Sequence, residues 1–584
     1  MPQHRQLRIF IRAAMQLGAL PARPVRWALV AAFTAWVIVD VFILKFSGGL
    51  AQSTYDAMVR GRMYAAAPDP RIVIIDIDEA SLARMSKEFG RWPWPRDTLA
   101  AVLDHVEKQK PSAVVWDIVF SDADRFSPGG DAAFNAAVQR SAHSHFSVVR
   151  LPEKNDSSSQ ITRKELPGLW LPGTPLNRAG EKSTVALIAP ALPAIAAGRM
   201  GYINGYADRD GVLRRFRYAE SLADGSAIQS LPLSVSDAVN SASRRIRTEG
   251  ITSVFAPVNE LLVWRKSANT YPLVSFADVF AQADGAAPLG SVPNFAGKVV
   301  IIGTTAPSLH DMHATPLSPT QAGVDSLATA IDNSLNGHHM AELPRWLQAL
   351  LAVLLCMGIA RWGRVYSVAS LAPALLLLPA ALLGISYLSL NGLPLFIDLN
   401  LAAGLSLIFL AALRVWNYWR RQYWSNLSLE DSSTDKLNRP KQGLWVWHRH
   451  DLWQASALDS LIDAIEIHAP HCRLITPDVN FSWPATPHWP ELAGLIAITG
   501  PYAELVAARK ALTRAIRKID KLGDVRHAAL KALPADTSRA ELCANALVDW
   551  ATLAQLQAES QTKSRLPCTN PAAGSATLLK GTDL

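Results

Sequence analysis

Four long apolar segments restrict what this chain can fold into more than any other feature. A helix of about 20 apolar residues crosses the hydrocarbon core of a bilayer. One segment precedes the polar stretch 45–343 and three follow it, at 27–44, 346–361, 368–390 and 396–415. The sequence therefore predicts a four-helix transmembrane region with a large domain between its first and second helices.

Most of the arginines beside these segments fall on one side of them, with Arg345 as an exception. Cytoplasmic loops are enriched in Lys and Arg, and the connector 391–394 carries no charge. We therefore expect the domain 45–343 to be extracytoplasmic and both termini, including the basic stretch 1–26, to be cytoplasmic. This topology also accounts for the net charge of +8, so no nucleic-acid partner is expected. The arginines concerned are Arg5, Arg8, Arg12, Arg23, Arg26, Arg361, Arg364, Arg414, Arg420 and Arg421.

The first segment is predicted to be a retained helix rather than a cleaved signal peptide. The apolar core of a signal peptide is about 7 to 15 residues long and ends at a small-residue cleavage site. The run 27–44 is longer, and no such site follows Lys45. Asp40 lies near the outer end of this run, where we interpret it as an interfacial residue rather than a proton relay.

Short β-branched runs within 45–343 predict the fold of the large domain. The runs 71–76, 113–120 and 298–303 read as strands buried on both faces of a sheet. Helical patterns at 98–108 and 322–335 lie between or after them, which is the order of an α/β domain with a mixed sheet. The Asp-Gly turn at 210–211 further predicts a β-hairpin over 200–218.

Five motifs in this domain occur in an order that resembles the CHASE2 family of bacterial extracytoplasmic sensor domains. One position departs from the family pattern, since Leu327 stands where the family usually has a histidine. The resemblance implies one membrane helix before the domain and three after it. The motifs are Ile75–Leu82 (IDIDEASL), Trp92–Arg96 (WPWPR), Trp116–Phe120 (WDIVF), Gly201–Asn204 followed by Asp208–Arg215 (DRDGVLRR), and Gly297–Gly303 (GKVVIIG) followed by Asp311, Thr315, Pro316, Gly323 and Val324.

Four acidic residues follow two of the predicted strands. Asp76, Asp78, Glu79 and Asp117 lie at the carboxyl ends of these strands, where open α/β sheets bind ligands. Carboxylates clustered there would suit Mg²⁺ or Ca²⁺, and Asp76, Asp78 and Asp117 are the candidate metal ligands. The structural alternative is that Asp78 caps the helix that begins at Glu79 while the others bond loop amides. Both interpretations stay open.

Further candidate ligand-binding residues lie in the loops. Trp92, Trp94 and Arg96 belong to a proline-stiffened segment that either presents its rings to a ligand or packs over the sheet. Asp210 reads as a turn residue with a weaker resemblance to a calcium loop. Asp311 stands between two histidines, His310 and His313, which lack an evident third metal ligand.

The C-terminal part is predicted to be a juxtamembrane linker at 416–442, a small α+β or α/β module at 443–558 and a disordered tail at 559–584. Helices are expected at 456–467, 500–521 and 539–556, and strands at 472–475 and 495–499. Proteins similar to CHASE2 often end in a kinase or nucleotide cyclase. No motif of those enzymes occurs here, so the module is predicted to be non-catalytic and no cofactor is expected.

Three functions remain open on the sequence. The first is a receptor in the bacterial inner membrane that senses an extracytoplasmic ligand or protein, signals to a cytoplasmic or envelope partner, and forms a homodimer. The second is a scaffold subunit of a membrane complex. The third is an extracytoplasmic metal-dependent hydrolase, which requires Asp76, Asp78 and Asp117 to converge on an ion.

Overall fold

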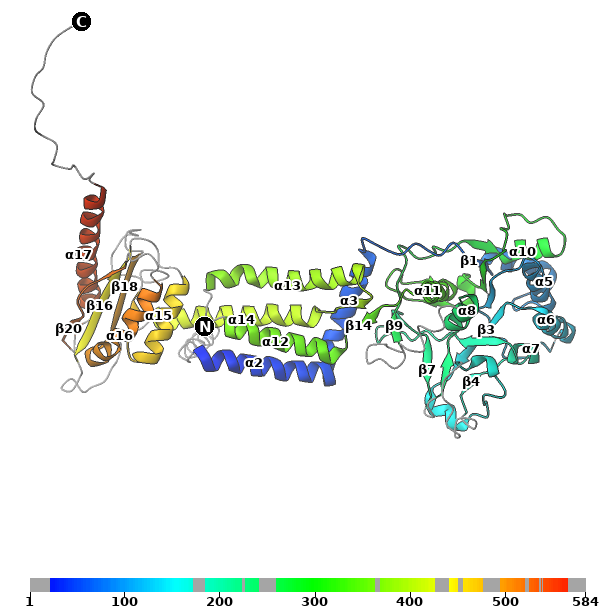
Figure 1. The fold of residues 1–584 in the computed structure, drawn as a ribbon, viewed down its shortest axis with the longest axis horizontal. Coiled ribbons are helices and arrows are strands. Elements are labelled where there is room, and N and C mark those ends of the chain that lie inside the picture. The colour runs from blue at the N-terminus through cyan, green and yellow to red at the C-terminus, as the bar shows by residue number, and fades with distance from the viewer. Residues whose placement is uncertain are drawn as a thin grey trace, which may run out of the picture. The chain divides into compact units, whose positions relative to one another are not determined.

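The computed structural model describes residues 22–125, 127–171, 184–222, 226–240, 259–362, 368–425, 441–449, 455–475, 494–519, 525–534, 537 and 539–565. The chain forms two compact units. One comprises Ile38–Leu350 with Ala381–Leu401, and the other Met1–Val37, Leu351–Ala380 and Ala402–Leu584. Figure 1 labels the elements along the chain.

A seven-stranded sheet forms the centre of the first unit. Its path is β10-β1-β11-β2-β3-β4, and β5 also pairs with β3. Every pair is parallel except β3 with β4, so the predicted mixed α/β sheet is confirmed. The strands are β1 (Ile72–Asp76), β2 (Ala113–Trp116), β3 (Ser144–Arg150), β4 (Leu187–Ile188), β5 (Arg199–Tyr202), β10 (Leu273–Ser275) and β11 (Val299–Gly303).

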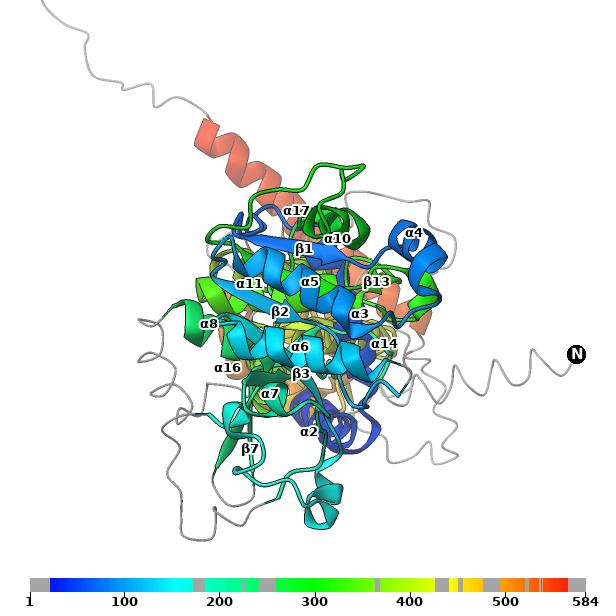
Figure 2. The same ribbon diagram turned by 90° about the vertical axis from the view of Figure 1, so that its right-hand side faces the viewer.

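Helices cover both faces of this sheet, because successive strand residues point to opposite sides. Val73 and Ile75 of β1 pack in one core with α4 (Glu79–Phe89), α5 (Arg96–Glu107), α6 (Pro128–Arg140), α7 (Pro193–Ala196) and α10 (Phe276–Ala283). Ile72 and Ile74 pack in a second core with α8 (Leu231–Val239) and α11 (Gly323–Asn336). Figure 2 looks onto α5 and α6, with β1, β2 and β3 behind them.

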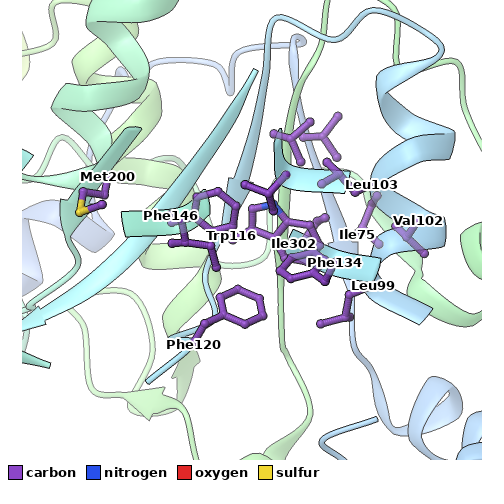
Figure 3. Packing of buried hydrophobic residues seen from close by; sticks show 14 of the residues in the cluster. Ile75, Leu99, Val102, Leu103, Trp116, Phe120, Phe134, Phe146, Met200 and Ile302 are labelled. Atoms are coloured by element: carbon purple, nitrogen blue, oxygen red, sulfur yellow. The ribbon is translucent and has the colours of Figure 1, made fainter. Parts of the chain in front are cut away.

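Aromatic side chains fill the first core. Trp116 stacks on Phe146 with 6.2 Å between ring centres and meets Phe134 edge-on at 5.1 Å (Figure 3). Phe120, four residues beyond Trp116, lies 5.8 Å from its ring. Because all four rings are at most 3% exposed, the motif Trp116–Phe120 serves the core.

The predicted hairpin over 200–218 is wrong. A tight turn does form, with the Gly211 amide donating to the Asp208 carbonyl at 2.9 Å. The two arms separate, because β5 joins the main sheet whereas β6 pairs with β9. The small strands and 3₁₀ helices of this region are β6 (Arg215–Arg217), β7 (Ala219–Ser221), β8 (Ala227–Gln229), β9 (Asn259–Leu261), β12 (Met312–His313), β13 (Gln321–Ala322), η2 (Glu153–Ser158), η3 (Pro167–Leu169) and η5 (Pro307–Leu309).

Three helices in the described parts of the chain are long and apolar enough to cross a membrane: Pro24–Leu44, Pro373–Gly392 and Asn400–Arg420. They lie in α2 (Ala22–Val39) with the π-helical turn η1 (Asp40–Leu44), in α13 (Val368–Gly392) and in α14 (Asn400–Ser425). α12 (Arg345–Trp362), the predicted second span, is not among them. The predicted third span after the domain starts too early, because Phe396 belongs to strand β15 (Leu395–Phe396).

Two additional elements join the large domain to these helices. α3 (Phe46–Arg60) follows the first apolar helix after a left-handed residue, Lys45. β14 (Ala341–Glu342) precedes α12 and pairs in parallel with β15. Figure 1 shows α3 and β14 at the same end of the domain.

The C-terminal unit contains an antiparallel five-stranded sheet in the order β17-β18-β16-β19, with β20 also paired to β16. α15 and α16 pack on one face and α17 on the other. Without α17, the order along the chain is βαββαββ, which is the ferredoxin-like βαββαβ order with its last strand divided into β19 and β20. The elements are β16 (Gln442–His448), α15 (Ala455–His468), β17 (Arg473–Ile475), β18 (Leu495–Pro501), α16 (Tyr502–Ile519), β19 (Arg526–His527), β20 (Lys531–Leu533) and α17 (Arg539–Arg565).

The expected strands and helices of the module are present with two differences in their bounds: α16 starts at Tyr502 because β18 continues to Pro501, and α17 continues past 558, where the module was expected to end. Strands β16, β19 and β20 were not predicted. Parts of three other expectations lie outside the described residues: the basic N-terminus before 22, the linker 426–440 and the tail from 566.

Candidate functional site

The carboxyl edge of the parallel sheet gathers most of the predicted site residues. Asp76 is paired with Gly303, and Ile302 with Trp116, so the loops after β1, β11 and β2 leave the same edge. The predicted metal site depends on where their carboxylates point.

Asp76 is held by the loop that follows β11. Its two carboxylate oxygens accept hydrogen bonds from the backbone amide of Thr305 at 2.8 Å and from its hydroxyl at 2.6 Å. Burial raises the pKa of Asp76, and the bonds from Thr305 oppose that rise. The carboxylate therefore secures the loop that follows β11.

The next two acids bond to backbone amides. Asp78 caps α4 by accepting a hydrogen bond of 2.7 Å from the Ser81 amide. Glu79 accepts one of 3.0 Å from the Ser308 amide, and this contact lowers the pKa of Glu79. These contacts match the structural alternative for Asp78 and Glu79.

Asp117 lies at the end of β2 near Asp311 and His313. Burial, and secondly the charge of Asp311, raise the pKa of Asp117 to about 7, while His313 lowers it. His313 Nε2 lies 3.2 Å from Asp311 Oδ1, and this contact raises the pKa of His313. We call Asp117, Asp311 and His313 the edge triad. Its charge changes near neutral pH.

Asp311 contacts the first residue of α11. The Gly323 amide donates to the Asp311 carbonyl at 2.9 Å. A Cβ atom at position 323 would lie 2.5–2.6 Å from the carboxylate atoms Oδ1 and Cγ. Glycine at this position lets the Asp311 carboxylate lie directly against the start of α11, so the edge triad contacts α11.

The three candidate metal ligands do not converge. Asp76 points to Thr305, Asp78 caps α4, and Asp117 neighbours Asp311. Within the described ranges, no group of three His, Cys, Asp or Glu side chains is placed to hold a metal ion. The convergence that a metal-dependent hydrolase requires is therefore not found there.

The proline-stiffened segment packs inward. Trp94 is 2% exposed and lies 5.3 Å from Phe276 between ring centres, while Trp92 meets it edge-on at 4.9 Å. Arg96 forms an ion pair of 2.5 Å with Asp131. Trp94 and Arg96 are therefore core and ion-pair residues, and Trp92, which is partly exposed, is the ring nearest to solvent.

Asp210 belongs to a buried network of ion pairs that could not be predicted from the sequence. Arg214, whose side chain is 1% exposed, pairs with Asp56 at 2.7 Å, Asp208 at 2.9 Å and Asp210 at 2.7 Å. Arg215 pairs with Asp208 and with Glu342 of β14, both at 2.5 Å. The adjacent arginines of the DRDGVLRR motif were the only signal, since Asp56 and Glu342 lie far away in the chain.

A second buried ion pair holds α11. Arg265 lies 2.5 Å from Asp332, and both side chains are at most 1% exposed. Asp332 also accepts hydrogen bonds from the Tyr271 hydroxyl at 2.9 Å and the Asp69 amide at 2.9 Å. Leu327, at the position where the resemblance leads one to expect histidine, is 5% exposed and packs in the core between α11 and the sheet.

One of three comparisons with known proteins gives a match. No curated protein and no solved structure matches the chain. The family model described as the CHASE2 domain matches residues 30–361, more than half of the chain. CHASE2 is a family of sensory extracellular domains, and this chain belongs to that family.

Proposed function

We propose that this protein is a multi-pass receptor of the bacterial inner membrane. Its domain senses an extracytoplasmic ligand or protein at the carboxyl edge of the sheet and transmits the change through α11 to the membrane helices. The C-terminal module then acts on a partner without catalysis. The observation that carries this proposal is the continuous path from the edge triad through α11 to β14 and α12.

α11 is suited to transmit such a change because it is held at both ends. Asp311 contacts its first residue, and the buried pair of Asp332 with Arg265 fixes its last turn. After α11 the chain enters β14 and then α12. A shift at the edge therefore reaches the membrane helix through packed elements, provided that the ligand prefers one of two states.

The buried ion network ties the same end of the domain to the first apolar helix. Asp56 lies on α3, which follows η1, and Glu342 lies on β14, which precedes α12. Arg214 and Arg215 join these two residues through their shared partner Asp208. The entering and leaving segments of the domain are thus coupled by charge.

Contacts within the large unit support four membrane crossings. α12 starts beside the connector after α13, because the Leu343 amide donates to the Phe396 carbonyl at 3.1 Å. α13 ends beside the domain, with the Tyr387 hydroxyl donating to the Gly61 carbonyl at 2.6 Å. If α13 crosses the membrane toward the domain, α12 must first cross away from it. Its 18 residues span about 27 Å.

Labelling in intact cells tests the topology. Cysteines replace the exposed Lys154 of the domain and the exposed Arg361 at the far end of α12. A membrane-impermeant maleimide should label the cysteine at 154 in cells whose outer membrane has been opened. It should reach the one at 361 only after lysis. Labelling of 361 without lysis, or protection of 154, overturns the arrangement.

Spin-label distances test the transmission. Labels on the exposed residues Leu350 and Leu388 report the spacing of α12 and α13 in nanodiscs. Asp311→Asn should shift this distance distribution because it alters the contact with α11. Asp104→Asn, which changes a surface carboxylate, should leave it unchanged. Identical distributions in all three proteins contradict transmission. A stoichiometric copurifying envelope protein then favours the scaffold function.

A further inference from the structure

A polar cavity lies where the large domain meets the ends of the apolar helices. Its volume is about 30 Å³, and it is open to solvent on one side. It lies within one compact unit and includes residues from η1, α3, α12 and the loop before α14. Its lining residues are Val41, Ser47, Gly48, Ala51, Gln52, Tyr55, Arg214, Arg215, Leu261, Glu342, Arg345, Gln348, Phe396, Asp398 and Leu401.

Arg345, which is exposed to solvent, is the lining cation that lacks a carboxylate partner among the described residues. The other two lining arginines, Arg214 and Arg215, are paired with carboxylates. Among the described residues, no carboxylate lies within the 4.0 Å ion-pair distance of Arg345. Its guanidinium lies over Gly48, where an added Cβ would be 2.7 Å from Nη2. The absent side chain at Gly48 thus leaves room for a positive group in the cavity wall.

Asp398 is the complementary anion. It is 5% exposed, and its Oδ1 accepts hydrogen bonds from the backbone amide of Asn400 at 2.9 Å and from its side chain at 2.7 Å. Within the part of the chain that the structure describes, no cation is paired with it, since Arg215 is engaged by Glu342. The cavity therefore presents one positive and one negative group that do not contact each other.

Apolar side chains surround this position. On α3, Gly48, Tyr55 and Asp56 are buried, whereas Phe46 and Leu50 are 78% and 65% exposed. Trp346, beside Arg345, is 58% exposed. An amphipathic helix with exposed Phe and Leu and a neighbouring Trp are features of a membrane interface.

We infer that this cavity binds the head group of a zwitterionic phospholipid of the phosphatidylethanolamine class. The phosphate would pair with Arg345 and the ammonium group with Asp398, while the acyl chains lie beside the exposed residues of α3. Charge-assisted bonds to both groups favour this lipid over an anionic one that lacks the ammonium group. The inference rests on the membrane arrangement under the proposed function.

The full chain, extracted gently and analysed by native mass spectrometry, tests the site. Nanodiscs contain equal amounts of phosphatidylethanolamine and phosphatidylglycerol. The unmodified protein should retain phosphatidylethanolamine. Arg345→Ala should retain an amount of this lipid that is lower by about tenfold or more. Asp398→Asn should abolish the preference between the two lipids. Equal retention by Arg345→Ala and the unmodified protein overturns the inference, as does an unmodified protein that prefers phosphatidylglycerol.

Two matched variants separate loss of the site from loss of fold. Arg361→Ala removes an arginine from the opposite end of α12 and should retain the lipid. Gly48→Val keeps every charge but displaces the Arg345 guanidinium, so it should lose the lipid at an unchanged melting temperature. Retention by Gly48→Val, or equal loss by Arg361→Ala, contradicts the site.

Free phosphoethanolamine distinguishes a lipid from a soluble ligand. It carries the same two charges without acyl chains, so it should bind the delipidated protein much more weakly than the lipid does. If free phosphoethanolamine bound with the same affinity as the lipid, the ligand would be a soluble zwitterion and the lipid assignment would be wrong. Cysteine labelling at 154 and 361 reads the topology independently of lipid retention, so failure of the lipid site can be told from failure of the receptor arrangement.

Discussion

Arg214 donates two hydrogen bonds to Asp56, from Nε to Oδ1 and from Nη2 to Oδ2, each 2.7 Å long. Asp56 lies on α3 and Arg214 just before β6, so the pair closes a long loop of the chain. Such a bidentate pair is geometrically specific. It fixes how the segment that follows the first apolar helix sits on the domain.

Removal of Arg214 should therefore destabilise the domain strongly. Arg214→Met leaves the carboxylates of Asp56, Asp208 and Asp210 without their shared cation, and breaking a buried pair costs about 3–5 kcal/mol. The matched control is Arg140→Met, because Arg140 pairs with Asp104 at the surface with 60% of its side chain exposed. Exposed pairs contribute about 0–1 kcal/mol. Denaturant unfolding of the purified chain compares the two, and equal losses would contradict the prediction.

The edge triad should make stability depend on pH. The folded pKa of Asp117, about 7, lies above its unfolded value of about 3.9. The native state then binds the extra proton between roughly pH 4 and 7, so stability falls as pH rises through this window. His313, with its raised pKa, acts in the same direction above its unfolded value of about 6.5.

Asp117→Asn isolates this effect. The variant should gain stability relative to the unmodified protein at pH 8 and differ little at pH 4. The gain at pH 8 is roughly 2–4 kcal/mol, since each pKa unit corresponds to about 1.4 kcal/mol and the carboxyl is only partly shielded from water. Melting temperatures measured from pH 4 to 8 check it. A constant difference across that range would show that Asp117 does not titrate there.

Asp40 should connect the first apolar helix to α3. Its carboxylate, 1% exposed, accepts a hydrogen bond of 2.9 Å from the Phe46 amide and further bonds from Ser47. Asp40→Ala removes this cap at a cost of about 1–2 kcal/mol and should loosen the junction at Lys45. Ser53→Ala, which removes an exposed hydroxyl of the same helix, is the control. Hydrogen exchange of residues 45–50 should accelerate in the first variant alone.

Trp94 and Trp92 should differ in their contribution to stability. Trp94 is 2% exposed and packs on Phe276, so Trp94→Ala leaves a cavity that costs about 3–5 kcal/mol. Trp92→Ala should cost distinctly less because its ring is partly exposed. Unfolding midpoints of both variants test the difference. A larger loss of stability for Trp92→Ala than for Trp94→Ala would contradict the prediction that Trp94 is the core residue of this segment.

The sequence by itself determined the local elements and the family. Runs such as Ile72–Asp76 and Val299–Gly303 are apolar on both faces, and only a sheet covered on both sides buries them. The spacing of apolar residues in α11 and in the module's helices is likewise a local feature, so these helices could be predicted from the sequence. Asp78 as a cap was readable for the same reason, because a cap is set by residues three positions apart.

Only the tertiary structure decided which strands and which charged residues pair when they lie far apart in the sequence. The predicted hairpin is wrong because β5 pairs with β3 and β6 pairs with β9, and both partners lie far from the Asp-Gly turn in the sequence. The ion network of Arg214 and the opposite charges of Arg345 and Asp398 likewise depend on segments that meet only in the folded chain. Charge pairing acts through space, and one sequence without its fold does not state which carboxylate an arginine will meet.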